Sequence, residues 1–504
     1  MLAEEEEISR MPTNPAMRVA SSRTDRLLSQ YVQDPGPTRK VFGLEPVLLG
    51  RIAWLGSPVI FGMLTQTAIN QIDSIMVGRL PEKVAVAGTA ALGPSLLLLW
   101  FFGGFLSAIS VGTQAVTARR YGAGDAEGAG RVLTNSILVA LSSSAVVTAI
   151  ALAVVEPIWN LLSHDPAVRE AGIVYSEVRM LGIFSMVAMA SYKSFYDGVG
   201  RVLVHMTIAV VMNIVNAILN YGLIFGELGM PAMGIEGAGW ASVLSSITGL
   251  VLIVLWSLRA DDRHRFRVYR LRNMDGGVAM TVSRLSFFSG LATMFVMTGF
   301  GLFYTIVGKI DELQGLPGVN VSAASIIINI MMLVFMTCIA FGTSTATLVS
   351  QSLGAKQPEL AERYGWQSVK IIALAMAIVG LVAYLFPETL LRIYLPEAQG
   401  DQTLKESVVQ LGAPSLQFCG FLAPIVAAAL VLTQALNGAG RTLFVMVVEL
   451  FLHFFCLVPL AYLFAVVADF GLMGCWYATA VYGVALAIAM GIKFRSGGWK
   501  KTVI

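Results

Sequence analysis

Long apolar stretches, each interrupted by only a few polar residues, run through the chain from residue 52 to residue 494. A helix needs about 20 mostly apolar residues to cross a bilayer, and twelve stretches reach this length. The interrupting Gly, Pro, Ser and Asn are tolerated in membrane helices because neighbouring helices satisfy the backbone. The sequence therefore predicts an all-α integral membrane protein with twelve transmembrane helices. The predicted helices cover residues 52–77, 86–116, 132–155, 172–195, 202–226, 237–258, 284–308, 322–350, 368–386, 407–436, 442–467 and 472–494.

The composition agrees with a membrane protein and excludes several other classes. Of the 504 residues, 56% are hydrophobic and 13% are charged, whereas soluble domains carry about 25% charged residues. The net charge of +3 gives no reason to expect a nucleic acid partner. The four cysteines lie in apolar stretches without metal-ligand spacing, so neither a disulfide framework nor a metal site is expected. Membrane lipids and small molecules are the expected partners.

The distribution of Lys and Arg predicts the topology. The longest basic connection runs from Arg259 to Arg284, and the positive-inside rule places it in the cytoplasm together with both termini. The first 50 residues have no apolar core and are expected to be a mostly disordered tail. The expected location is the plasma or inner membrane. The predicted divisions are a tail at 1–50, an amino lobe at 51–258, a basic cytoplasmic linker at 259–283, and a carboxyl lobe with a short tail at 284–504.

Three short motifs occur once in each half of the chain. The paired segments are residues 120–125 with 352–357, 198–201 with 438–441, and 234–237 with 471–474. Their glycines are 232, 240 and 237 positions apart, in the same order in both halves. Six helices return the chain to its starting side, so the two halves are predicted to be six-helix lobes related by a parallel repeat. A pathway between such repeats is a transporter architecture.

The sequence contains no Walker A motif and no hydrolase motif of the G-x-S-x-G or H-E-x-x-H type. We therefore expect no enzyme activity and no cofactor, and transport would depend on an ion gradient. Coupling to an ion needs an ionisable or cation-ligating group inside the membrane, where such groups are costly and mark function. Two polar stripes meet this need, one formed by Gln66, Asn70 and Asp73, and one formed by Asn213, Asn216 and Asn220.

Asp73 lies 22 residues beyond Arg51, and Asn220 lies 19 residues beyond Arg201. The helical rise therefore puts the two side chains at similar depths in the membrane. Ser242, near the outer start of the sixth helix, reaches the same layer. Carboxylate, amide and hydroxyl oxygens suit a hard cation such as Na⁺, and the carboxylate can instead take a proton. A second interpretation is that Asp73 is a solvated residue near the membrane surface.

The carboxyl lobe offers another pair of ionisable residues. Glu449 and His453 are four residues apart on the eleventh helix and lie 8 and 12 residues beyond Arg441, close to the middle of the membrane. Two interpretations remain open for them. They satisfy each other inside the helix bundle, or they serve as a proton relay or as the binding site for a substrate cation.

Several segments resemble the signature of the MATE (multidrug and toxic-compound extrusion) family, and the resemblance extends over residues 52–494. These segments are Asp73–Leu80, Arg120–Asp125, Asn216–Gly226 and the two Gly-x-Gly-Arg turns. The resemblance implies a V-shaped pair of six-helix lobes around a central cavity. It also implies export of organic cations or other amphipathic compounds in exchange for Na⁺ or H⁺.

The resemblance further implies an amino-lobe cation site at Asp73, Asn216, Asn220 and Ser242. This chain departs from archaeal relatives, which carry an acidic residue at the position of Asn220 and another near Pro58. It also lacks the acidic residues that NorM-type members carry near Met294 and Val426. Coupling is therefore expected to depend mainly on the amino lobe.

The favoured function is a secondary active exporter that works by alternating access. A lipid-linked precursor flippase of the same superfamily is an alternative, but such a protein would need several basic residues in its cavity, and the helices offer little beyond Arg179 and Lys193. A receptor or scaffold without transport is a third interpretation. The sequence is compatible with a monomer.

Overall fold

The computed structural model describes residues 33–36, 43–163, 165–315, 318–395, 402–502 and 504, without the side chains of residues 66–74, 82–86, 402 and 404. Every regular element in this part of the chain is a helix. Eleven helices are long and apolar enough to cross a membrane, and a pair bent by 44° makes the twelfth. The predicted twelve-helix fold is therefore confirmed.

The amino lobe holds the first six spans, of which the second and fourth are interrupted. Leu99 is followed by a π-helical turn, η2 (Trp100–Gly104), and the fourth span bends at Gly182. The elements are α3 (Pro46–Val77), α4 (Glu82–Leu99), α5 (Phe105–Ser107), α6 (Ile109–Gly122), α7 (Ala126–Leu162), α8 (Pro166–Leu181), α9 (Ile183–Gly198), α10 (Val202–Phe225) and α11 (Gly234–Ser257).

The carboxyl lobe holds the other six spans, and its eleventh span contains two π-helical segments, η4 (His453–Leu457) and η5 (Leu463–Val467). The remaining elements are α13 (Gly276–Gln314), α14 (Val319–Gly354), α15 (Pro358–Leu385), α16 (Pro387–Ile393), α17 (Gln402–Gly438), α18 (Thr442–Leu452), α19 (Val458–Tyr462), α20 (Gly471–Arg495) and the 3₁₀ turn η6 (Gly498–Lys501).

Several helices begin earlier than hydropathy predicts, because polar caps extend them beyond the apolar core. The Asp125 carboxylate accepts a hydrogen bond from the Gly128 backbone, and α7 begins at residue 126 rather than at 132. The Asp275 carboxylate likewise caps α13, which begins at residue 276 rather than at 284. A cap satisfies backbone N–H groups that the first helical turn leaves open.

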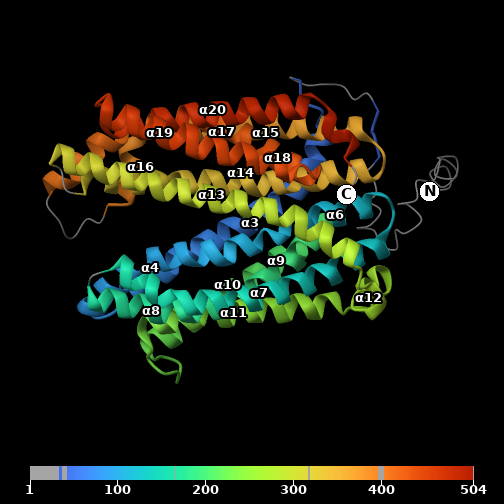
Figure 1. Cartoon of the computed structure of the whole chain (residues 1–504), viewed down its shortest axis with the longest axis horizontal. Coiled ribbons are helices and arrows are strands. Elements are labelled where there is room, and N and C mark those ends of the chain that lie inside the picture. Colours follow the sequence, from blue (N-terminus) through green and yellow to red (C-terminus); the bar gives the residue numbers. More distant parts are fainter. Residues whose placement is uncertain (1–32, 37–42, 164, 316–317, 396–401, 503) are drawn as a thin grey trace.

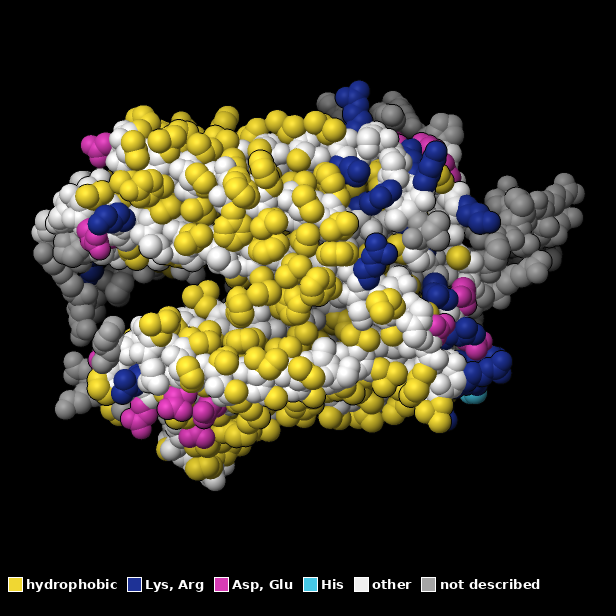
Figure 2. Space-filling model, viewed as in Figure 1, with side chains coloured by type: hydrophobic (Ala, Val, Ile, Leu, Met, Phe, Trp, Pro, Cys, Tyr) yellow, Lys and Arg dark blue, Asp and Glu magenta, His cyan; other side chains and the backbone are white. Residues whose placement is uncertain are grey.

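The helices run roughly along one axis and form two lobes (Figure 1). We call the end at which α12 (Ala260–Phe266) and the carboxyl terminus lie the linker end, and the opposite end the open end. The first helix of each lobe also packs against the other lobe, α3 against α14 and α13 against α6. Figure 2 shows the lobes in contact in the half toward the linker end, with a cleft between them at the open end.

Backbone geometry confirms the internal repeat. The turns at Gly200 and Gly440 have φ angles of 81° and 82°, and those at Gly234 and Gly471 have φ angles of 57° and 54°. A positive φ is strained for residues with a side chain, so each pair places glycine where the same turn requires it. Matching turns at the matching motifs mean that the two lobes follow the same path.

The basic connection between the lobes is folded onto the amino lobe. The buried Asp262 carboxylate of α12 accepts hydrogen bonds from Arg201 and from the Tyr196 hydroxyl. Phe266 is fully buried and packs edge-on against Phe195. Burial raises the pKa of Asp262, and the positive charge of Arg201 opposes this rise. Buried ionic and aromatic contacts thus anchor the linker to the amino lobe.

Residues assigned to the tail from the sequence also contact the carboxyl lobe. Arg363 of α15 forms ion pairs with Asp34 and with the buried Glu45. Arg51 on α3 donates a hydrogen bond to the Tyr364 hydroxyl and another to the Gln33 carbonyl. The remainder of the predicted tail, residues 1–32 and 37–42, lies outside the described residues.

The predicted topology can be tested by labelling. Cysteines introduced at Gly124 and Arg267, both at the linker end, should react with a membrane-impermeant thiol reagent only from the cytoplasmic side. A cysteine at Leu228, which is 63% exposed between α10 and α11 at the open end, should react only from outside. The parent protein is the control, because Cys338, Cys419 and Cys475 are buried and Cys456 is half-buried. Labelling of all three positions from one face would contradict the topology.

Candidate functional site

The structure brings together three of the four residues of the predicted amino-lobe cation site. The Asn216 Nδ2 atom lies 3.5 Å from the Ser242 Oγ atom of the neighbouring helix α11. The Asn220 Nδ2 atom donates to the Asn216 Oδ1 atom at 3.1 Å. All three side chains are buried. They form one polar cluster between α10 and α11, which we call the amino-lobe cluster.

The side chains of Gln66, Asn70 and Asp73 lie outside the described residues, but the backbone of α3 fixes the level of residue 73. A Cβ atom built on Gly62 of α3 would lie 4.0 Å from the Met206 Cα atom of α10. Residue 73 is eleven positions beyond Gly62, and Asn216 is ten positions beyond Met206. Both helices run from the linker end toward the open end, so residue 73 lies at the level of the amino-lobe cluster.

Asn213 extends the amino-lobe cluster by one turn toward the linker end. It is buried, and neither its amide nitrogen nor its amide oxygen has a hydrogen-bond partner within the described part of the chain. Buried amide groups without partners are uncommon and often mark a site for a water molecule or an ion. Asn213 therefore offers an additional oxygen ligand beside the predicted site.

The predicted pair in the carboxyl lobe also forms a cluster. The Glu449 Oε2 atom lies 3.3 Å from the His453 Nδ1 atom and accepts a hydrogen bond of 2.9 Å from the Tyr482 hydroxyl of α20. The His453 and Tyr482 rings are 4.6 Å apart at their centroids. All three residues lie inside the lobe, and Glu449 and His453 are 6% and 2% exposed. We call this group the carboxyl-lobe cluster.

Sequence reasoning missed Tyr482, although the repeat contained a signal for it. Residues 234–237 match residues 471–474 at a spacing of 237, and the same spacing relates Tyr482 to Ser245, one turn beyond Ser242 on α11. Applying the repeat to the sixth helix of each lobe would have pointed to this position. Gly299 of α13 makes room for the imidazole, because a Cβ atom there would lie 2.6 Å from the His453 Cδ2 atom.

A further group of polar residues, which the sequence did not reveal, joins the two lobes near the linker end. The Gln114 side chain on α6 donates to the Thr347 hydroxyl on α14 at 2.7 Å, and that hydroxyl donates to the Asp197 carbonyl at 3.0 Å. The Gln351 side chain donates to the Gly198 carbonyl at 2.8 Å, and Ser350 donates to the carbonyl of residue 115 at 2.7 Å. We call this contact surface the inter-lobe seam.

Close backbone contacts at the inter-lobe seam require glycine at two positions. A Cβ atom on Gly122 would lie 2.1 Å from the Gln351 carbonyl oxygen, and a Cβ atom on Gly354 would lie 2.0 Å from the Arg119 carbonyl oxygen. Gly122 and Gly354 are 232 positions apart, and so are Arg119 and Gln351. The inter-lobe seam therefore consists of the same contact made twice. The glycines that revealed the repeat in the sequence are the ones that close the linker end.

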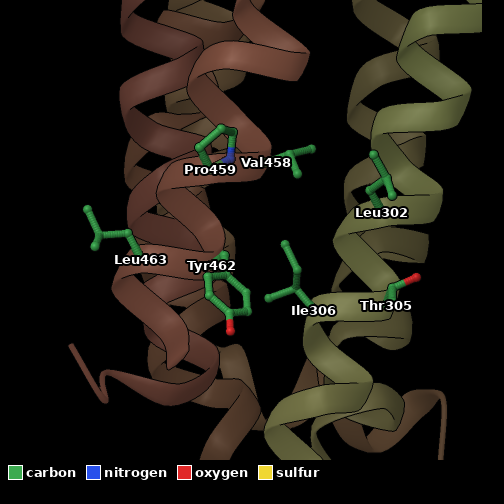
Figure 3. Close-up of a pocket in the computed structure, with 7 residues that line it drawn as sticks. All are labelled: Leu302, Thr305, Ile306, Val458, Pro459, Tyr462 and Leu463. Atoms are coloured by element: carbon green, nitrogen blue, oxygen red, sulfur yellow. The ribbon is translucent and has the colours of Figure 1, made fainter. Parts of the chain in front are cut away.

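A cavity of about 580 Å³ lies in the carboxyl lobe between α13 and the interrupted eleventh span (Figure 3). Its lining is almost wholly apolar and comprises Leu302, Thr305, Ile306, Val458, Pro459, Tyr462 and Leu463. Leu302 is three residues beyond Gly299, and Val458 is five residues beyond His453. The cavity thus follows the carboxyl-lobe cluster along the same pair of helices toward the open end.

These features define a polytopic membrane protein built from two similar lobes, closed at one end and cleft at the other. Known proteins share this architecture. A transporter of the MOP superfamily from Pyrococcus furiosus superposes with a TM-score of 0.81 at 20% identity, over 90% of this chain and 96% of that one. A multidrug resistance MATE transporter in an outward-facing conformation superposes with a TM-score of 0.79 at 21% identity, over 90% and 96% of the two chains.

Sequence relatives cover nearly the whole chain as well. A probable multidrug resistance protein NorM of Thermotoga maritima is 23% identical over 472 residues, 91% of this chain and 95% of the relative. The multidrug resistance protein PmpM of Pseudomonas aeruginosa is 25% identical over 418 residues, 82% of this chain and 83% of the relative. The sequence model of the family described as MatE matches residues 58–222 and 291–463. The chain therefore belongs to the MATE family of membrane transporters.

Proposed function

We propose that the protein is a secondary active multidrug exporter that exchanges organic cations or other amphipathic compounds for Na⁺ or H⁺. The observation that carries this proposal is similarity over most of the chain to proteins named for multidrug resistance. The cleft between the lobes and the apolar cavity beside the carboxyl-lobe cluster suit ligands with large apolar parts. We further propose that the protein works in the cell membrane, with both termini in the cytoplasm, and needs no cofactor besides the coupling ion.

The amino-lobe cluster is the proposed coupling site. Asn216, Asn220 and Ser242 present amide and hydroxyl oxygens at one level of the lobe, and Asn213 adds an amide without a partner. Asp73 would supply the negative charge at that level. Oxygen ligands of this kind suit Na⁺, while a single carboxylate can instead take a proton. Gln66 and Asn70 are secondary candidates on the same stripe.

Export would proceed by alternating access. In the present arrangement the inter-lobe seam closes the linker end, which the distribution of Lys and Arg assigns to the cytoplasm in this proposal. Substrate from the cytoplasm can enter only after the seam opens, and the open end must then close. Ion and substrate would favour different arrangements, since a ligand shifts an equilibrium only by its difference in affinity for the two states.

Efflux from proteoliposomes tests this proposal. We expect wild-type protein to export a fluorescent organic cation when a Na⁺ or pH gradient is imposed, and Asp73→Asn to remove the response to the gradient. The Asp73→Asn variant should still insert and fold, because removing a charge from a low-dielectric site does not by itself destabilise the protein.

Glu227→Gln is the matched control, because this exposed carboxylate lies between α10 and α11 at the open end. It should transport like the wild type. Gradient-driven efflux by well-folded Asp73→Asn protein would contradict the proposed coupling site. Failure of wild-type protein to move any organic cation under either gradient would contradict the proposed function and favour a different cargo.

A further inference from the structure

The internal repeat relates the carboxyl-lobe cluster to the amino-lobe cluster. The spacing of 240 between the Gly-x-Gly-Arg turns makes His453 the counterpart of Asn213. The spacing of 237 makes Tyr482 the counterpart of Ser245. Both lobes therefore place polar residues between their fifth and sixth helices at the same level. The difference lies in the chemistry, because the carboxyl lobe carries groups that can gain or lose a proton.

We propose that Glu449, His453 and Tyr482 form a proton-binding site that releases its proton when a hydrophobic organic cation binds in the carboxyl lobe. This inference rests on the proposed function and deepens it, since it makes substrate binding in the carboxyl lobe depend on pH while the amino-lobe cluster remains the proposed coupling site. It also decides between the two interpretations that the sequence left open for Glu449 and His453.

The hydrogen bonds define which atom takes the proton. The His453 Nδ1 atom lies 2.9 Å from the Glu449 backbone carbonyl, which can only accept, so Nδ1 carries hydrogen. The Nε2 atom is then the basic position of the neutral imidazole. The Glu449 carboxylate accepts from Tyr482 and lies beside His453 Nδ1, as an ionised carboxylate does. With a proton on Nε2 the cluster is neutral, and without it the cluster carries one negative charge.

Few other groups compete for this proton. On the elements that pack against the cluster, the other titratable residues near this level are Cys456 of η4, Cys419 of α17, Tyr304 of α13 and Tyr477 of α20. The charged residues of α13 and α20 are more distant, since Lys493 is eleven residues beyond Tyr482 and Lys309 is ten beyond Gly299. At 1.5 Å per residue these separations are about 15–17 Å. The net charge of the cluster is therefore set by Glu449 and His453.

The apolar cavity supplies a place for the cation. Its nearest lining residues are three and five positions beyond Gly299 and His453, or about 5–8 Å along the helices. The apolar body of a cation fits this lining (Figure 3), and its charge would lie close to Glu449. At a distance of about 8 Å and an effective dielectric constant of about 20, one negative charge strengthens cation binding about thirtyfold.

Proton release follows from this electrostatic balance. When the cation enters, the N–H bond at Nε2 breaks, the electron pair stays on the nitrogen and the proton leaves to water. The positive charge of the cation then replaces that of the proton. The helix is π-helical from His453 to Leu457, a distortion that often occurs at functional sites. Binding of one cation at the carboxyl-lobe cluster thereby releases one proton.

Binding of tetraphenylphosphonium, a permanent organic cation, to the purified full-length protein tests the inference. Wild-type affinity should rise with pH by up to about tenfold per pH unit, since one proton is displaced per cation. In weakly buffered solution with a pH indicator, binding should release about one proton per cation under conditions in which the site is protonated. Glu449→Gln should bind about thirtyfold more weakly than wild type at high pH and release no proton.

His453→Asn introduces the residue that the repeat has in the amino lobe, and it guards against a Glu449 variant that does not fold. It should keep strong binding at pH values at which the wild type has lost it, because asparagine cannot take the proton. Glu312→Gln, an exposed carboxylate at the end of α13, is the matched control and should behave like the wild type.

Two results would overturn the inference. One is binding without proton release by the wild type, and the other is an unchanged pH dependence in folded Glu449→Gln protein. Either result, together with gradient-driven efflux, would leave the proposed function standing. Absence of both binding and efflux of organic cations would overturn the inference and the proposed function together.

Discussion

Replacing Gly122 or Gly354 with alanine is expected to force the lobes apart at the linker end. Each new methyl group would lie about 2 Å from a backbone oxygen of the other lobe, and backbone cannot move aside as a side chain can. Overpacking of this kind costs about 1–3 kcal/mol. If the cost falls on the closed seam alone, the population with an open linker end rises about 5- to 150-fold.

The measurement is the reaction rate of a cysteine introduced at Ser350, which is fully buried in the inter-lobe seam. The rate with a thiol reagent should rise by the same factor when Gly122→Ala or Gly354→Ala is added. Gly301→Ala and Gly308→Ala are matched controls on α13, because a Cβ atom at either position meets no heavy atom within 4 Å. Equal rates in all four variants would mean that the glycine contacts do not hold the linker end closed.

Asp262→Ala is expected to destabilise the protein by about 3 kcal/mol, at the lower limit for breaking a buried ion pair. Arg201 would remain largely buried, with a side chain 12% exposed, and would keep a longer ion pair of 3.5 Å to Asp261. Tyr196 would lose its acceptor as well. Equilibrium unfolding in mixed detergent micelles measures the loss, and release of the linker should increase the rate of limited proteolysis at Arg267.

Asp261→Ala is the matched control, because Asp261 is the neighbouring acidic residue in the first turn of α12 and its side chain is 58% exposed. Its substitution should change the free energy of unfolding by no more than about 0.5 kcal/mol. Similar losses in both variants would show that the acidic character of the turn matters, and would contradict a specific role for the buried pair.

The parts of the fold that were predicted from the sequence depend on local properties. The length of an apolar stretch is enough to place a membrane helix. The motifs that occur in both halves of the sequence identify the glycines at positions 122, 200 and 440. The common level of Asn216 and Asn220 followed from helical rise alone. The early starts of α7 and α13 were missed because a carboxylate cap extends a helix through polar residues that hydropathy excludes.

The inter-lobe seam could not be predicted because its contacts join residues more than 200 positions apart. Gln114 and Gln351 are ordinary polar residues of α6 and α14, and nothing in the sequence around them indicates that they reach carbonyl groups of the other lobe. Tyr482 was missed for a related reason, since a tyrosine in a membrane helix is common, and the repeat points to position 482 without indicating its contact with Glu449.

The inter-lobe seam has the geometry of a two-fold dimer interface, in which each contact occurs twice with the two partners exchanged. Gly122 contacts Gln351, and their counterparts in the repeat, Gly354 and Arg119, make the same contact. A single six-helix chain with this motif could make the same contact with a second copy of itself. When the copies are joined through α12, that contact is kept, but the two halves no longer need the same sequence elsewhere. One lobe can then carry Asn213 where the other carries His453.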